Sequence, residues 1–294
     1  MGSIPATWDR FVLFESADGK ELCGEPVDKD VDVGEAVAAG ETVMVNVLDV
    51  SSALSEGGRP TGETASIHKL LSPIRPSEVG TVRCVGLNFK DHAAELQCPL
   101  PDIPEVFFKP SNTITNPSSP IILPSCAPSA VDAEVELAVI IGRDCRNVSV
   151  AEAPAYILGY TAANDVTARD VQKQTSQWGF SKSFDGFCPL GPCIVRASAM
   201  CSAVSGVGLK SVLDGEVLQD GSTDEFIFSV GEIVAHLSRD TTLPRGTVIL
   251  TGTPSGIGHS KKPPRYLKPG CDLSVSITPS IGTLRNKVVS SSKV

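Results

Sequence analysis

Two glutamates one residue apart, Glu134 and Glu136, begin an apolar run that ends at Ile141. In a β-strand, alternate side chains point to opposite faces, so both carboxylates are expected on one face beside a hydrophobic core. Like charges in that position repel each other and resist desolvation. A hard divalent cation removes both problems, because Mg²⁺ and similar ions bind carboxylate oxygens. With Asp165 as a third oxygen ligand, the pattern predicts an active-site metal.

His92 and Glu95 are three residues apart, so on a helical turn they share a face. A carboxylate beside an imidazole fixes its tautomer and raises its basicity, which would make His92 a base that activates water. The alternative is an exposed ion pair without a catalytic role, which is the commoner arrangement at this spacing.

Three polar residues follow Asp165, namely Arg169, Gln172 and Lys182. Arg169 and Gln172 could bind a carboxylate or carbonyl group of a substrate, although surface ion pairing of Arg169 with Asp170 is an alternative. Lys182 stands among aromatic residues, and a lysine near a divalent metal could stabilise an enolate or oxyanion. The alternative for Lys182 is a place at the edge of the core, with its ammonium group reaching solvent.

Residues 250–258 form a glycine-rich segment after an expected strand. A turn of this kind could present backbone N–H groups, including those around Gly252, together with Thr253, to a carboxylate or phosphate. The segment is neither a Walker loop nor a dinucleotide fingerprint. No Gly-Lys-Ser/Thr sequence ends it, and no helix with a following acidic residue is apparent.

The elements expected to position these residues are mainly strands. Asp214-Gly215, between two apolar runs, predicts a type I′ hairpin. Ser149 and Ser229 each begin a capping box; Pro154 limits the first helix to a short piece, and the second should end near Leu237. Residues rich in Gly, Ser and Glu indicate a loop. That loop is expected at residues 51–66, and a helical turn is expected at residues 91–96. Strands are expected at residues 8–14, 41–50, 82–87, 246–250 and 273–277.

The chain has 294 residues, of which 41% are hydrophobic, and this supports one large domain or a domain with a smaller neighbour. We expect a small β-rich N-terminal domain over residues 1–75 and a main domain over residues 76–294. Strands outnumber helices and do not alternate with them. The expected class is therefore α+β, mostly β, and a doubly wound sheet is disfavoured.

The net charge of −9 and the lack of a basic stripe argue against a nucleic-acid partner. No apolar run is long enough to span a membrane, and the N-terminus lacks the apolar core of a signal peptide. The nine cysteines contain no Cys-x-x-Cys pair, so reduced thiols are favoured over a disulfide framework or a zinc site. These features together indicate a cytoplasmic protein, with a mitochondrial location left open.

Taken in order, the motifs resemble those of the fumarylacetoacetate hydrolase superfamily, in particular its domain-containing proteins. The resemblance keeps the family's order and spacing over residues 70–290, and the N-terminal part matches only loosely. Asp132 and Ala133 depart from the family pattern, and we expect this to affect the choice of substrate and to leave the metal ligands untouched. The matching segments are residues 85–95, 107–111, 134–142, 159–170, 182–185, 188–192, 251–258 and 281–286.

The resemblance implies a mixed β-roll catalytic domain, a smaller N-terminal domain and a homodimer. It also implies that the His-Glu pair lies on a segment that orders over the substrate, a small 2-oxo acid. The residues that it assigns are Glu134, Glu136 and Asp165 as ligands of Mg²⁺ or Mn²⁺, His92, Glu95 and Lys182 as catalytic groups, and Gln172 and Thr253 as substrate contacts.

The metal suggests the substrate class, because a 2-oxo acid can chelate Mg²⁺ through its carboxylate and 2-oxo oxygens. We expect a metal-stabilised enolate near Lys182, and His92, oriented by Glu95, to take a proton from water. That water would attack the distal carbonyl of a 2,4-dioxo acid and cleave the C3–C4 bond. The same enolate permits decarboxylation or keto–enol tautomerisation of oxaloacetate. A larger β-dicarbonyl substrate in a biosynthetic role and a non-catalytic scaffold are further alternatives.

Overall fold

The computed structural model describes residues 6–200 and 204–291. The N-terminal residues considered for a signal peptide, as far as residue 5, and Cys201 lie outside the described residues. All eight cysteines within them are free thiols, as expected. Within the same residues, no helix is both long and apolar enough to cross a membrane.

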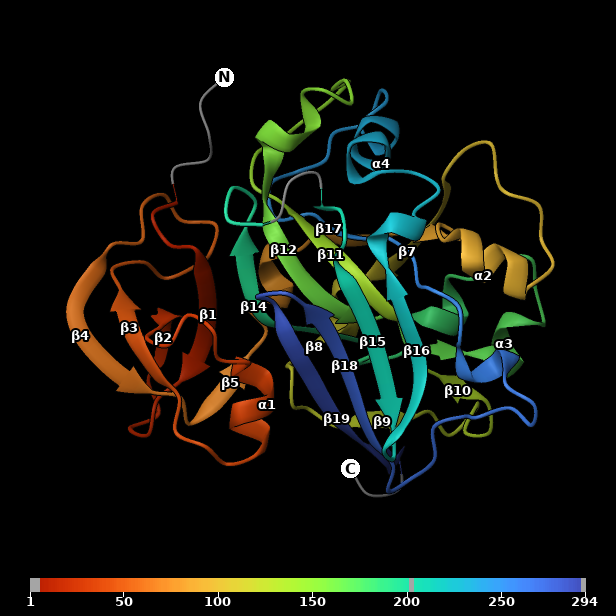
Figure 1. The fold of residues 1–294 in the computed structure, drawn as a ribbon, viewed down its shortest axis with the longest axis horizontal. Coiled ribbons are helices and arrows are strands. Elements are labelled where there is room, and N and C mark those ends of the chain that lie inside the picture. The colour runs from red at the N-terminus through yellow and green to blue at the C-terminus, as the bar shows by residue number, and fades with distance from the viewer. Residues whose placement is uncertain (1–5, 201–203, 292–294) are drawn as a thin grey trace.

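Twelve strands of the described residues form the largest sheet, which starts in the N-terminal region and crosses the centre of the molecule (Figure 1). In the order of hydrogen-bonded neighbours it contains β4 (Pro60–Ser66), β3 (Met44–Leu48), β2 (Glu21–Pro26), β1 (Arg10–Glu15), β14 (Cys188–Arg196), β12 (Ile157–Asn164), β11 (Val135–Ile141), β17 (Val248–Leu250), β6 (Thr81–Gly86) and β7 (Glu105–Pro110), with β5 (Lys69–Leu71) beside β1 and β8 (Ile114–Thr115) beside β14.

A five-stranded sheet lies in front of the central strands in Figure 1, and a two-stranded ladder lies near the site described below. The larger of these contains β16 (Glu216–Ser222), β15 (Gly208–Leu213), β18 (Asp272–Thr278), β19 (Gly282–Ser290) and β9 (Ile121–Leu123), and the smaller pairs β10 (Val131–Asp132) with β13 (Thr167–Ala168). The mostly β architecture expected from the sequence is therefore confirmed.

The helices are short. They are α1 (Val33–Ala38), α2 (Lys90–Glu95), α3 (Arg169–Gln172) and α4 (Val230–Leu237). Single 3₁₀ turns lie at Pro76–Glu78, Ser111–Thr113, Ala153–Tyr156, Phe180–Lys182, Thr223–Glu225 and Gly258–Ser260. The capping box predicted at Ser229 is confirmed, because its side chain accepts from the Glu232 N–H and the Glu232 carboxylate accepts from the Ser229 N–H.

The hairpin prediction is also confirmed. Asp214 and Gly215 both have positive φ, of 51° and 83°, as a type I′ turn requires between β15 and β16. Two other predictions are wrong in part. Residues Pro60–Ser66 form β4 and not a loop; this edge strand is mostly exposed, so its polar sequence carries no alternating pattern. After Ser149 the Glu152 carboxylate accepts from the Ser149 N–H, as expected of a capping box, but only a 3₁₀ turn forms, at Ala153–Tyr156.

Strand β11 is buried on both faces, which explains its apolar sequence. Val135, Leu137 and Val139 belong to one hydrophobic cluster, and Ala138 and Ile140 belong to a second cluster on the other side. Alternation along a strand therefore places the two glutamates on the face shared with the second cluster.

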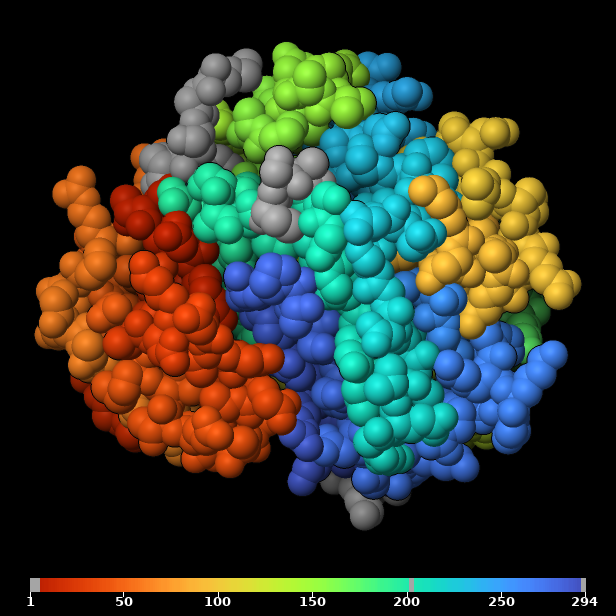
Figure 2. All heavy atoms as spheres, in the orientation of Figure 1, coloured from red at the N-terminus to blue at the C-terminus, as the bar shows by residue number. Residues whose placement is uncertain are grey.

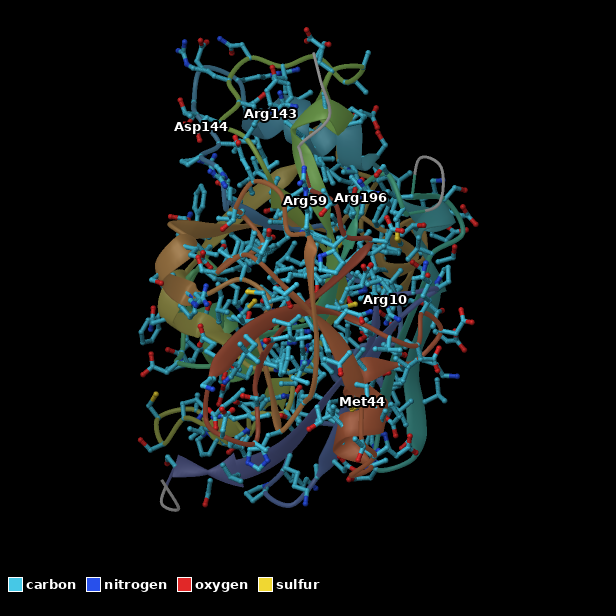
Figure 3. All side chains as sticks on the ribbon, turned by 90° about the vertical axis from the view of Figure 1, so that its left-hand side faces the viewer. Arg10, Met44, Arg59, Arg143, Asp144 and Arg196 are labelled. Atoms are coloured by element: carbon cyan, nitrogen blue, oxygen red, sulfur yellow. The ribbon has the colours of Figure 1, made fainter. Side chains whose placement is uncertain are left out.

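The first 75 residues lie against the rest of the molecule along β1, which pairs with β14 through the register Phe11↔Ile194. Figure 3 views this side of the molecule and labels Arg10 and Arg196. Arg196 Nη2 lies 2.6 Å from Asp9 Oδ1, and Arg10 donates to the Lys29 and Val31 carbonyls. The division into domains at residues 1–75 and 76–294 stays a prediction.

Candidate active site

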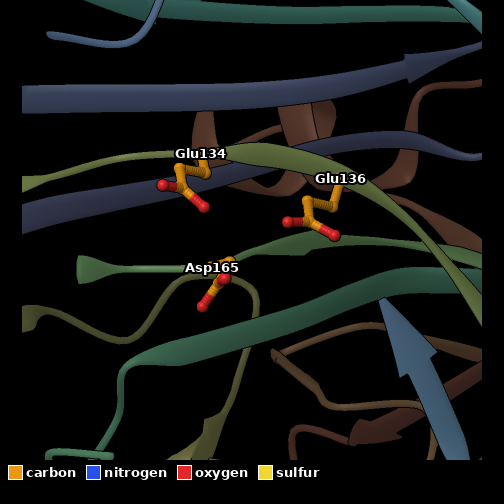
Figure 4. A group of neighbouring side chains, drawn as sticks. All are labelled: Glu134, Glu136 and Asp165. Atoms are coloured by element: carbon orange, nitrogen blue, oxygen red, sulfur yellow. The ribbon is translucent and has the colours of Figure 1, made fainter. Parts of the chain in front are cut away.

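The three predicted acidic residues converge. One carboxylate oxygen from each of Glu134, Glu136 and Asp165 lies within 4.8 Å of the others, and all three side chains are buried (Figure 4). The pairing of two strands brings them together, because β11 and β12 are antiparallel with Val135 opposite Asn164. Asp165 directly follows β12, and its N–H donates to the Glu134 carbonyl over 2.9 Å.

Three buried cations surround two of these carboxylates. Lys182 Nζ lies 2.5 Å from Asp165 Oδ2 and 2.9 Å from Glu134 Oε2. Lys109 Nζ lies 2.6 Å from Asp165 Oδ1, and Arg169 Nη2 lies 2.6 Å from Glu134 Oε1. Burial acts to raise the pKa of Glu134, but Lys182 and Arg169 outweigh it and hold that pKa well below its usual range. Glu134 therefore stays ionised.

Glu136 differs from its neighbours because it has no cation beside it among the described residues. Its carboxylate accepts one hydrogen bond, from the Gly252 N–H over 2.6 Å. Burial, together with repulsion from Asp165 and Glu134, raises the pKa of Glu136 well above its ordinary value. Three oxygen donors, one of which has no ion-pair partner among the described residues, fit a hard divalent cation, which binds carboxylates and would favour the charged form of Glu136.

His92 and Glu95 lie on α2 and contact each other. His92 Nδ1 is 2.8 Å from Glu95 Oε2, and the other Glu95 oxygen accepts from the Gly256 N–H over 2.8 Å. Burial acts to raise the pKa of Glu95, but the bonds from His92 and Gly256 lower it below its ordinary value. Both side chains are largely buried, at 9% and 19% exposure. The pair is therefore tied to the glycine-rich turn and is not a loose surface contact.

The glycine-rich turn contributes backbone to the site. Gly252 has φ of +95°, and a Cβ atom there would lie 2.8 Å from the Asn88 Cβ, so glycine is required. The Thr253 hydroxyl donates to the Val135 carbonyl over 2.8 Å and accepts from Gln219 Nε2 over 2.7 Å. The hydroxyl proton of Thr253 is therefore already donated within the protein and is not available to a ligand. Among the described residues the Thr253 backbone N–H has no hydrogen-bond acceptor, and Thr253 lines the cavity described below.

Arg169 is held by two carboxylates and by Gln172. Its Nε and Nη2 donate to Asp132 Oδ2 over 3.0 and 2.8 Å, and its Nη1 donates to Gln172 Oε1 over 3.1 Å. Its ion pairs are with Asp132 and Glu134, whereas the sequence alternative was Asp170. We expected the departure from the family pattern at Asp132 to leave the metal ligands untouched. Asp132 nevertheless positions Arg169, which contacts Glu134.

Two further residues of the site were not predicted from the sequence. Lys109 is fully buried on β7, within a segment that carried the family resemblance but had no assigned role. Gln219 is fully buried on β16; its Oε1 accepts from the Val135 N–H and the Ser211 hydroxyl over 3.0 Å each. Its Nε2 donates to Thr253 and to the Pro254 carbonyl. No local sequence pattern marks Gln219, because its partners come from other elements.

A cavity of about 380 Å³ opens beside these groups. It adjoins α2, which lies on the opposite side of the molecule from the N-terminal strands, as the colours of Figure 2 show. The predicted site residues that line it are His92, Glu134, Glu136, Arg169, Gln172, Lys182, Gly252 and Thr253. Asp165 lies below this lining, and Glu95 acts through His92.

Comparisons with known proteins agree with this site. A family model described as "Fumarylacetoacetate (FAA) hydrolase C-terminal" matches residues 81–289. The chain is 36% identical to the caffeoylpyruvate hydrolase of Neonothopanus nambi over 98% of this chain and 96% of that protein. It is 34% identical to the oxaloacetate tautomerase YisK of Bacillus subtilis over 86% of this chain and 85% of that protein. A crystal structure of 2-hydroxyhepta-2,4-diene-1,7-dioate isomerase from Mycobacterium marinum matches with a TM-score of 0.79 and 35% identity, covering 96% of this chain and 98% of that one.

Proposed function

Because the chain belongs to the fumarylacetoacetate hydrolase family, we propose that it is a divalent-metal-dependent enzyme that hydrolyses the C3–C4 bond of a 2,4-dioxo acid of the acylpyruvate type. A relative that spans nearly the whole chain is named as a hydrolase of one such acid. The observation that carries the proposal is the buried Glu136 carboxylate, which has two acidic neighbours and no cation beside it among the described residues.

Glu134, Glu136 and Asp165 would hold the cation, Mg²⁺ or Mn²⁺, and their oxygens suit either ion. Bound there, the cation would supply Lewis-acid chemistry at the carboxylate and 2-oxo oxygens of the substrate. The Thr253 backbone N–H would donate to the same end of the substrate. Gln172, held by Arg169, would contact the substrate farther out in the cavity.

His92 is the base in this proposal. Its Nδ1 lies against the Glu95 carboxylate, which leaves Nε2 without a partner among the described residues and able to take a proton from water. The water oxygen bonds to C4, the C3–C4 bond breaks, and its electron pair passes to C3 and the 2-oxo oxygen. Lys182 would lie near that developing charge. The His92 proton then returns to C3, giving pyruvate and a carboxylic acid.

The test is hydrolysis of acetylpyruvate by the purified protein with Mg²⁺ or Mn²⁺ and after chelation. We expect turnover that depends on the metal. His92→Ala should lower kcat by about 10²- to 10⁴-fold and leave Mg²⁺ binding unchanged by calorimetry. Retained hydrolysis in His92→Ala would reject the role of this residue, and the absence of Mg²⁺ and Mn²⁺ binding would reject the whole proposal.

Keto–enol tautomerisation of oxaloacetate is the second candidate, because several relatives, including the one from Bacillus subtilis, are named oxaloacetate tautomerases. It needs a proton added at C3 and a proton removed from the 2-hydroxyl oxygen, for which the same His92 and Lys182 suffice. Decarboxylation of oxaloacetate would place the electron pair at the same carbon. Incubation with enol-oxaloacetate, with loss of the enol absorbance and CO₂ release followed separately, distinguishes tautomerisation from decarboxylation, and turnover of acetylpyruvate reports the hydrolysis.

We also propose that the protein is a homodimer, as the family resemblance implies. Sedimentation equilibrium on the full chain is the direct test. A mass near the 30.8 kDa of one chain across the micromolar range would reject a stable dimer.

A further inference from the structure

We propose that the outer part of the cavity is a binding site for a flat, conjugated acyl group that ends in a hydroxyl, so that the substrate is an aryl or arylvinyl acylpyruvate. This inference rests on the proposed function and adds to it the identity of the acyl group. It is carried by an aromatic wall beside the acidic cluster, by a histidine and tyrosine that the proposed chemistry does not use, and by the size of the cavity.

The aromatic wall begins at the catalytic lysine. Lys182 Nζ lies 4.8 Å from the centre of the Phe107 ring, and both residues line the cavity. The Phe107 ring centre is in turn 5.8 Å from that of Trp178, with the two ring planes at 71°. Both rings line the cavity. A substrate chelated at the acidic cluster would therefore extend its acyl group along two successive aromatic rings, which favour flat π-systems.

The position of Trp178 depends on a glycine. A Cβ atom on Gly86, at the end of β6, would lie 2.7 Å from the indole ring. The indole therefore lies directly against the backbone of the strand, and any larger residue at position 86 would displace it. Further apolar side chains line the cavity, among them Leu87 and Ile257.

A polar group lies on the same cavity, outside the proposed chemistry. His259 Nδ1 is 2.6 Å from the Tyr266 hydroxyl, and the His259 backbone N–H donates to Asp132. Burial lowers the pKa of His259, and the nearby charges of Lys173 and Arg169 lower it further, so the imidazole is neutral near pH 7. Its Nε2 has no partner among the described residues. A hydroxyl group can donate to or accept from this nitrogen, depending on the tautomer that Tyr266 selects.

The size of the cavity agrees with an acyl group of this kind. Its volume of about 380 Å³ falls within the range of roughly 300–1,000 Å³ that buries most of a drug-sized ligand. A four-carbon acid held at the cation would leave most of the aromatic wall in contact with water. An aryl group would cover that wall, and burial of apolar surface favours binding.

The test measures binding of two uncleavable acids by calorimetry in Mg²⁺. 2-Oxobutanoate carries only the chelating end, whereas 2-oxo-4-phenylbutanoate adds a phenyl ring, and neither has a 4-oxo group to hydrolyse. We expect the phenyl acid to bind about tenfold more tightly in the wild type. Trp178→Ala should remove most of that advantage without weakening 2-oxobutanoate, and Trp178→Phe should keep it. Equal affinity of the two acids in the wild type, or an unchanged advantage in Trp178→Ala, would overturn the inference.

A 4-hydroxyphenyl analogue of the longer acid tests the polar end. His259→Ala should lose the added affinity of the hydroxyl, about 3- to 10-fold, and keep that of the phenyl ring. His236→Ala, on α4 and outside the cavity lining, is the matched control. Because binding requires no turnover, failure to hydrolyse acetylpyruvate would reject the proposed function and leave this result standing. A hydroxyl effect that persists in His259→Ala would overturn the role of His259.

Discussion

Gly252 donates its backbone N–H to the Glu136 carboxylate over 2.6 Å, and this is the only hydrogen bond to that carboxylate among the described residues. Glu134 and Asp165 each have a lysine in contact, whereas Glu136 relies on one amide. The acidic cluster is therefore incomplete on the side of Glu136, next to the cavity. This asymmetry leads to the first prediction.

Glu136→Gln should weaken Mg²⁺ binding and stabilise the metal-free protein. The amide keeps the shape of the side chain but removes an acid whose raised pKa reflects the cost of burying it beside Asp165 and Glu134, and the gain is on the order of 1 kcal/mol in the free energy of unfolding. Wild-type protein should gain about 2.7 kcal/mol when Mg²⁺ is present at 100 times its Kd, and the variant should gain little at that concentration. Thermal unfolding with and without Mg²⁺ measures both effects. Glu41→Gln, at an exposed position, is the control, and a variant that gains as much from Mg²⁺ as the wild type would contradict the prediction.

Asp132→Asn should lower metal affinity or kcat by about 10- to 100-fold, although Asp132 is not in the acidic cluster. Its carboxylate holds Arg169, and Arg169 contacts Glu134. The amide cannot hold the guanidinium through two charge-assisted bonds. Asp170→Asn, on the same helix as Arg169, is the matched control, because Asp170 accepts from the Val171 N–H instead. Mg²⁺ titration and kcat are measured for both variants. Equal effects of the two substitutions would show that Asp132 does not position Arg169 for metal binding or catalysis.

Gln219→Leu should destabilise the protein by about 2–4 kcal/mol and lower kcat. The substitution leaves the Val135 N–H without its acceptor, and it leaves Thr253 Oγ1 and the Pro254 carbonyl without their donor. Chemical denaturation gives the stability, and acetylpyruvate turnover gives the activity. Gln174→Leu, at an exposed position, controls for the change of residue type. A loss of stability with kcat unchanged would limit Gln219 to a structural role.

Stability should depend on Glu95 at neutral pH and lose that dependence in acid. Because the pKa of Glu95 is lower in the folded protein than its ordinary 4.5, its contribution is present above 4.5 and disappears as the pH falls through the folded value. Glu95→Gln should therefore be less stable than the wild type at pH 7, and the difference should shrink below pH 4.5. Denaturant unfolding across this range measures it. A difference that is constant with pH would contradict the assigned hydrogen bonds from His92 and Gly256 to the Glu95 carboxylate.

Local sequence patterns predicted those features whose cause is local. The alternation along β11, the type I′ turn at Asp214-Gly215 and the capping box at Ser229 each depend on residues within a few positions of one another. The edge strand β4 was missed because strand pairing, and not an apolar face, holds its polar sequence in place.

The acidic cluster could be predicted because the chemistry of three buried carboxylates admits few explanations, even though Asp165 is distant in sequence from Glu134 and Glu136. The groups around the cluster could not be predicted in this way. Lys109 reaches Asp165 from another strand, and Gln219 reaches Thr253 from a different sheet.

The sequence by itself thus determined which residue types are available for chemistry and which short elements hold them. The tertiary structure alone decided that Arg169 pairs with Asp132, that Glu136 lacks a cation beside it among the described residues, and that aromatic rings line the cavity. The physical reason is that hydrogen bonds, ion pairs and burial act over a few ångströms in space. The strand order that brings these side chains within that distance is set by the packing of the whole chain.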